Sequence, residues 1–239
     1  MTKPVRLGLA VVLVAGLAAF FALLILPRIT GSWAAPQARA DLLKTPVYVQ
    51  LQKHEPVVFE SLVAEYALVL RGKVSAQRYT DVANAAISTV ATQRIAHASD
   101  AALLALMQDM LDKLQLLRAR SPDDCYRYLF PKVAGPPDIR RWFDGASQAR
   151  TLGLMADVIR TSAESPVEVP ARFRVEPLLG PVINDIYAQF GENTQLISRA
   201  EEPGVNRATV CAVSVTLYEK VMRLPPADAA AVIRTMTQM

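Results

Sequence analysis

Residues 99–120 read SDAALLALMQDMLDKLQLLRAR, and this stretch decides the fold. Its apolar side chains recur at spacings of four, three, four and three, the period of a helix with one apolar face. They are Leu103, Met107, Met110, Leu114 and Leu117. Ser99 and Asp100 suit the start of this helix. Asp109 and Lys113 lie four residues apart, and we expect this pair on the water-facing side.

Weaker helical patterns flank this stretch on both sides. Helical spacing predicts further helices over 55–70, from Ser75 onward, over 144–160 and in the last 35 residues. The segment 166–177 alternates between prolines, which predicts an extended loop or a small edge hairpin. The sequence therefore predicts an all-α or mostly α bundle of about seven helices after the N-terminal transmembrane helix, with room for one short edge hairpin if 166–177 is not a loop.

Twenty uncharged residues, LGLAVVLVAGLAAFFALLIL, run from Leu7 to Leu26. At 1.5 Å per residue such a helix spans about 30 Å, the thickness of the hydrocarbon core of a bilayer. We therefore predict a transmembrane helix here. An uncleaved signal anchor is favoured over a cleaved signal peptide, because Ala38-Arg39-Ala40, the best cleavage motif, lies well beyond the apolar stretch.

The predicted organisation has three parts. Residues 1–30 form the anchor, 31–45 a juxtamembrane linker rich in small residues, and 46–239 a helical extracytoplasmic domain. Within that domain Pro46 to Leu51 alternates and could form a short strand or an extended segment.

The net charge of +4 does not indicate nucleic-acid binding. Residues 1–40 hold four basic residues and no acid, so 22 of the 26 basic residues remain beside all 22 acidic ones. A nucleic-acid partner requires a basic face that such a balance does not predict. The basic residues near the apolar helix suit lipid head groups instead, which makes the bilayer the first predicted partner.

The expected location is a bacterial inner membrane, with the N-terminus in the cytoplasm and the domain in the periplasm. The bacterial source is inferred from alanine richness and from 19 arginines against 7 lysines. The orientation follows from the short basic tail and from the cysteines.

Cys125 and Cys211 are the two cysteines of the chain, 86 positions apart. In an oxidising compartment such a pair indicates a disulfide, whereas two buried thiols are the alternative. A catalytic cysteine would need a histidine partner, and neither His54 nor His97 lies in a recognisable motif.

Other reactive side chains have ordinary explanations. Ser147 lacks the strand and the later histidine of a nucleophile elbow and suits a first helical turn. The acids Asp123 and Asp124 suit a helix start. The histidines lack the spacing of a zinc site. The sequence therefore predicts no catalytic residue, no metal site and no cofactor.

The candidate binding patch consists of Lys132, Arg140, Arg141 and Trp142, on and beside a proline-fixed loop. A guanidinium pair beside an aromatic ring suits a carboxylate, phosphate or sugar, or a partner protein. Alternatively, Trp142 packs on the core while the arginines are solvated.

Three hypotheses on function follow. The first is a membrane-tethered periplasmic interaction module without catalysis, such as an envelope assembly component or an inhibitor, whose partner is another envelope protein. The second is a hydrolase acting on envelope polymers, which requires a pocket with two acids or a histidine. The third is a helical carrier of a lipid or small ligand, which requires a cavity between helices.

Overall fold

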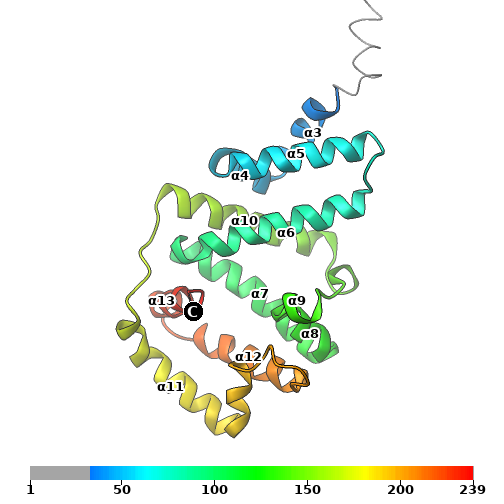
Figure 1. Ribbon diagram of the computed structural model, residues 1–239. Coiled ribbons are helices and arrows are strands. Elements are labelled where there is room, and N and C mark those ends of the chain that lie inside the picture. Colours follow the sequence, from blue (N-terminus) through cyan, green and yellow to red (C-terminus); the bar gives the residue numbers. More distant parts are fainter. Residues whose placement is uncertain (1–32, 239) are drawn as a thin grey trace, which may run out of the picture. The chain divides into compact units, whose positions relative to one another are not determined.

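The computed structural model describes residues 33–238, and their regular secondary structure is entirely helical (Figure 1). The α-helices are α3 (Ala34–Leu42), α4 (Pro46–His54), α5 (Pro56–Leu70), α6 (Ala76–Arg94), α7 (Asp100–Arg120), α8 (Pro122–Leu129), α9 (Pro131–Ala134), α10 (Gly145–Glu164), α11 (Arg172–Phe190), α12 (Arg207–Val221) and α13 (Pro226–Met236). Short 3₁₀ turns are η2 (Ile95–His97), η3 (Ile139–Arg141) and η4 (Gly191–Ile197). The predicted all-α class is confirmed for these residues, but the expected number of about seven helices is too low, because eleven α-helices lie in this part of the chain.

The alternative of an edge hairpin over 166–177 is wrong. Residues 166–171 are non-helical, and α11 begins at Arg172. Val175, Val182 and Ile186 are its buried residues, at spacings of seven and four that belong to a helix. Pro177 and Pro181 lie on its exposed side, where water can satisfy the carbonyl groups that each proline leaves unpaired.

Side-chain caps fix the starts of five of the described α-helices. Five side-chain oxygens each accept a hydrogen bond from the backbone N–H three residues later, at 2.8–3.3 Å, and they belong to Ser75, Ser99, Ser121, Asp144 and Asn206. Such caps satisfy backbone donors that have no partner within the helix. The starts of α6, α7, α8, α10 and α12 are thus written locally in the sequence.

The chain divides into two compact units, and unit 1 covers residues 1–86. Its described core contains Val47, Leu51, Phe59 and Leu62, and the hydroxyl of Tyr79 donates to that of Tyr48 at 3.2 Å. Each of α4 and α5 begins with a proline in its first turn, a position that needs no N–H donor.

The predicted linker over 31–45 is corrected by helix α3. Ala34, Ala38 and Leu42, each four residues apart, bury one side of α3, which packs against α5. Arg39 of α3 also pairs with Glu60 of α5. The segment Pro46 to Leu51 belongs to α4 and is not extended. Small residues thus mark a closely packed helix here, and α3 begins twelve residues before the predicted boundary at 46.

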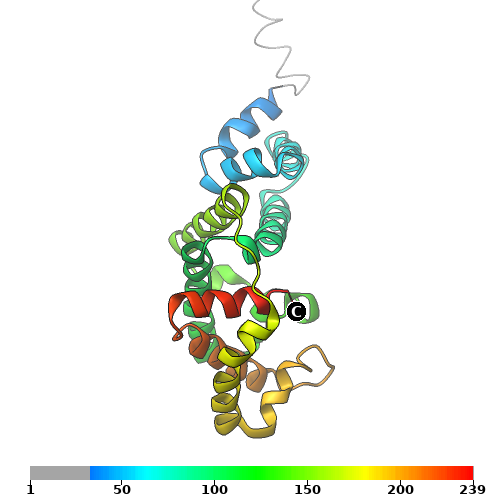
Figure 2. The ribbon, with the colours of Figure 1, turned by 90° about the vertical axis from the view of Figure 1, so that its left-hand side faces the viewer.

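Unit 2 covers residues 87–239, and α7 lies at its centre. Helix α7 contacts α8, α10, α12 and α13, and the last of these also packs on α11 (Figures 1 and 2). The predicted apolar face is confirmed, since Leu103, Met107, Leu114 and Leu117 are buried. The prediction that Asp109 and Lys113 face water is wrong, because both are buried against α10.

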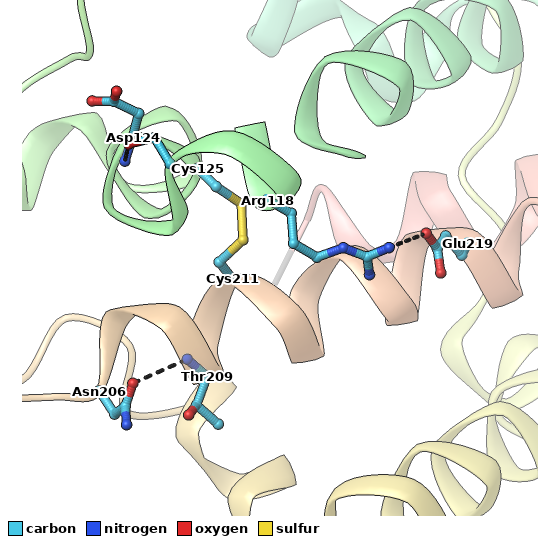
Figure 3. Close-up of a disulfide and its surroundings, with 8 residues drawn as sticks. Arg118, Asp124, Cys125, Asn206, Thr209, Cys211 and Glu219 are labelled. Carbon is cyan, nitrogen blue, oxygen red and sulfur yellow. Dashed lines mark hydrogen bonds and ion pairs between the residues drawn. A yellow bond between two sulfur atoms is a disulfide. The ribbon is translucent and has the colours of Figure 1, made fainter. Parts of the chain in front are cut away.

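The predicted pairing of Cys125 with Cys211 is confirmed. The two sulfur atoms are bonded at 2.02 Å and join α8 to α12 (Figure 3). Both residues are fully buried in a cluster that includes Leu111, Leu117 and Val215. Nearby, Arg118 of α7 donates to Glu219 of α12 at 3.1 Å. The bridge therefore fixes α8 against α12, and both of these helices contact α7.

The predicted transmembrane helix, Leu7–Leu26, lies outside the described residues, as does the whole of the predicted 1–30 anchor. Among residues 33–238, no helix has both the length and the apolar character needed to cross a membrane.

Removal of the disulfide should lower stability strongly. The bridge closes a loop of 86 residues, for which the chain-entropy model gives about 4 kcal/mol. We expect the Cys125→Ala/Cys211→Ala chain to lose roughly that free energy of unfolding, measured by urea titration monitored by circular dichroism. Each single variant should lose about as much as the double variant, because either one removes the whole bridge. Additive losses would contradict a bridge that stabilises the fold.

Candidate ligand cavity

Unit 2 encloses a partly open cavity of about 560 Å³. Its wall is mostly aliphatic and sulfur-containing, and is contributed by α7, α10, α12, α13, the C-terminal part of α6, η2 and the segment from α8 to η3. The apolar wall residues include Ala91, Ile95, Leu106, Met107, Met110, Leu129, Ile139, Met155, Ile233 and Met236. The volume lies within the roughly 300–1,000 Å³ that is typical of small-molecule sites.

Four methionines give this wall its character: Met107, Met110, Met155 and Met236. Methionine side chains are unbranched and polarisable, so they fill irregular space and adjust to ligands of different shape. Two of them come from adjacent turns of α7, and the other two come from α10 and α13. A wall of this kind favours an elongated apolar guest over a rigid polar one.

A buried polar cluster borders the cavity where α7 meets α10. The Oδ2 atom of Asp109 accepts hydrogen bonds from the ammonium group of Lys113 and, at 2.8 Å, from the hydroxyl of Thr151. Lys113 also donates to Thr151, and its Nζ atom lies 5.6 Å from the centre of the Phe143 ring. The guanidinium of Arg150 approaches Asp109 Oδ1 at 3.6 Å. Asp109 and Thr151 line the cavity, whereas Lys113 lies behind them.

Burial makes this cluster energetically demanding. Asp109 and Lys113 are 5% and 6% exposed, and a charge taken from water costs several kcal/mol unless partners replace its hydration. Lys113 has a carboxylate, a hydroxyl and an aromatic face as partners. With Arg150, the cluster carries two positive charges and one negative charge. The Asp109 carboxylate is thus compensated within the protein, and the cluster keeps one excess positive charge.

Two tyrosines also line the cavity, Tyr128 from α8 and Tyr218 from α12. Burial, and then the nearby Asp109 carboxylate, raise the pKa of Tyr128 to about 12. Burial alone raises the pKa of Tyr218. Both phenols therefore stay protonated near neutral pH. Within residues 33–238 neither hydroxyl makes a hydrogen bond, so each is a donor that a ligand could use.

The predicted binding patch is partly brought together. Arg140 and Arg141 are exposed in η3, where Arg140 pairs with Asp138 at 3.1 Å. The guanidinium of Arg141 lies 5.0 Å from the ring centre of Trp142. Lys132 is exposed on α9. Binding of a ligand by this patch stays a prediction.

Trp142 is half-buried and packs against the cluster around the disulfide. Its indole N–H donates to Asp124 Oδ2 at 3.0 Å. This contact ties the η3 turn to the start of α8, which is the structural role considered for Trp142 as an alternative.

The side chains set aside in the sequence have structural partners. The N–H of Ser147 donates to the Asp144 cap in the first turn of α10. The His97 ring lies 3.0 Å from the Val167 carbonyl, and Arg207 donates to Asp123 at 2.7 Å. Among residues 33–238 no three His, Cys, Asp or Glu side chains gather as metal ligands would.

Sequence reasoning missed the cavity and its polar residues. Asp109 was assigned to a solvated face, and Tyr128, Thr151 and Tyr218 were not identified as site residues. One signal was available: Ala102, Leu106, Asp109 and Lys113 repeat the four-three-four spacing of the apolar face, shifted by one residue. A helix with two adjacent faces of this spacing is covered over more than half its circumference.

Comparisons with protein-family models, with curated proteins and with solved structures gave no match. Function is therefore inferred from the geometry of the chain itself.

Breaking the buried pair should be more costly than replacing it. In Asp109→Leu the charge of Lys113 keeps only the Thr151 hydroxyl and the Phe143 ring as partners. We therefore expect the free energy of unfolding to fall by about 3–5 kcal/mol. The Asp109→Leu/Lys113→Met chain buries no ion at these positions and should recover most of that loss. Urea unfolding of the three chains measures both effects.

As a control, Arg160→Met breaks an exposed contact with Asp157 and should leave the unfolding midpoint unchanged. If the double variant were as unstable as Asp109→Leu, the ion pair would itself stabilise the fold, and the loss in Asp109→Leu would not come from the unpaired charge of Lys113.

Proposed function

We propose that this chain is a non-enzymatic binding module whose unit 2 holds a small apolar ligand. The observation that carries the proposal is the cavity of about 560 Å³ with its aliphatic and methionine wall. This volume lies in the range of small-molecule sites, and the apolar wall would remove the apolar surface of such a ligand from water.

A hydrolase is less well supported. Acid–base cleavage of a glycosidic bond requires two carboxyl groups facing the substrate, whereas the described wall offers only Asp109. That carboxylate is already engaged by Lys113 and Thr151, and neither His54 nor His97 lines the cavity. Ligand retention needs none of these groups to react.

We further propose that Leu7–Leu26 tethers the module to a bacterial inner membrane with both units in the periplasm. Twenty uncharged residues suffice to span the bilayer. The bridge between Cys125 and Cys211 supports an oxidising compartment, where structural disulfides persist. Another envelope protein stays a proposed partner, which could deliver or receive the ligand.

Ligand occupancy can be tested by photolabelling. The full chain is held in lipid nanodiscs and exposed to a dodecyl methyl ether that carries a diazirine, and labelled peptides are mapped by mass spectrometry. We expect labels on α7 and α10. Met155→Trp fills the cavity and should reduce this labelling at least tenfold.

The matched control is Met222→Trp, which makes the same change at a half-buried methionine outside the cavity wall. It should label like the unmodified chain. Labels spread over the exposed surface, and unchanged by Met155→Trp, would contradict a cavity ligand.

The compartment is tested with a new cysteine at Phe173, which is 69% exposed on α11. We expect Phe173→Cys to react with a membrane-impermeant maleimide in intact cells. The unmodified chain should not react, because its two cysteines are buried and bonded. Reaction only after the cells are broken would place unit 2 in the cytoplasm.

A further inference from the structure

We infer that the cavity selects a single-chain lipid with an uncharged, oxygen-containing head group, such as a long-chain alcohol or ester. This inference rests on the proposed function, since it concerns the ligand of the same cavity. It follows from which charges and which hydrogen-bond donors reach the cavity wall.

A cationic head group has no free partner there. Asp109 is the only charged side chain in the described wall. Its Oδ2 atom accepts from Lys113 and Thr151, and its Oδ1 atom faces Arg150 at 3.6 Å. An ammonium head group would have to compete with these two cations for one carboxylate. The site therefore disfavours a positive charge.

An anionic head group meets the opposite difficulty. The positive charge nearest to Asp109, on Lys113, lies behind the wall and is used by Asp109, Thr151 and the Phe143 ring. A carboxylate in the cavity would lie beside the Asp109 carboxylate, which is the only charged group in the described wall, and the two would repel each other. It would also leave its own hydration without a replacement. A negative charge is therefore disfavoured as well.

Neutral oxygen acceptors do have partners. The Tyr128 and Tyr218 hydroxyls both belong to wall residues, and neither has a hydrogen-bond partner among residues 33–238. Burial holds both in the protonated, donating form by raising their pKa. A hydroxyl or ester oxygen of a ligand could therefore accept a hydrogen bond from either phenol.

The remaining wall suits an alkyl chain. Met107, Met110, Met155 and Met236 surround space that no hydrogen-bonding group could use well. An alkyl chain gains about 0.8 kcal/mol per buried methylene group, as expected for any apolar site. The alkyl chain of the ligand thus supplies the affinity, and its head group determines which lipids are selected.

The test is competition against the photoreactive dodecyl ether, with the full chain in lipid nanodiscs. The competitors are 1-dodecanol, dodecanoate and dodecyltrimethylammonium, each corrected for partition into empty nanodiscs. We expect dodecanol to halve the labelling of α7 and α10 at a free concentration at least tenfold below that of either ion. Equal or stronger competition by an ion would overturn the head-group inference while the cavity function stands. Failure of the ether to label α7 and α10 at all would overturn the proposed function itself.

Two kinds of variant assign the groups responsible. Tyr128→Phe and Tyr218→Phe remove one donor each. At least one of them should weaken competition by dodecanol about fivefold or more. Competition by dodecane, which has no head group, should not change. Tyr187→Phe is the matched control, since Tyr187 is half-exposed on α11 and donates to Glu192. Unchanged dodecanol competition in both cavity variants would overturn the role of the phenols.

Asp109→Asn removes the negative charge beside the cavity and leaves Lys113 uncompensated. Dodecanoate should then compete at least tenfold better than with the unmodified chain, whereas dodecanol should change little. No gain for dodecanoate in a folded variant would overturn the role of Asp109. If this variant does not fold, the comparison of the three competitors on the unmodified chain decides the inference.

Discussion

Helix α7 is enclosed by α8, α10, α12 and α13, so the charged groups on its buried side must find partners within the protein. Asp109 and Lys113 meet this requirement by binding each other and Thr151 of α10. Hydrophobic contacts alone would let α10 slide along α7, because they have little directional preference. The hydrogen bonds to one hydroxyl fix the position of α10 along α7. The cavity wall depends on that register, because it determines where Met110 of α7 and Met155 of α10 lie relative to each other.

The disulfide constrains another side of the same helix. It joins α8 to α12, and the cluster around it includes Leu114 and Leu117 of α7. The polar cluster and the bridge therefore hold two flanks of α7 by different means, one through charge compensation and one through a covalent bond. Between them the wall is made of flexible methionines and of phenols without protein partners. Rigid flanks around an adaptable wall suit the binding of a ligand better than they suit a merely imperfect core.

Much of the fold could be predicted because its signals are local. Caps such as Ser99 and Asn206 mark helix starts within four residues, and the cysteine pair was the simplest bridge to propose. The errors share one cause, which is that burial depends on neighbours distant in sequence. Small residues over 34–42 resembled a linker until α5 covered them. On α6, Val82 is exposed whereas Ala83 one position along is buried, and no local pattern in the sequence distinguishes the two.

The site could not be predicted for the same reason, more severely. Its polar members come from α7, α8, α10 and α12, and no spacing in the sequence joins them. An acid and a lysine four residues apart look alike on a wet face and on a buried one, since the pair satisfies itself in both. The two cases differ in the neighbouring residues. Here the apolar residues Ala102 and Leu106 precede the pair on the same flank of α7. A solvated face does not require these apolar residues, so their presence indicates a buried flank that includes the ion pair. An ion pair in that position is not explained by stability, because apolar residues would fill the flank at least as well. The proposed ligand offers another reason, since a pair that occupies both of its charges leaves neither free to bind a charged head group.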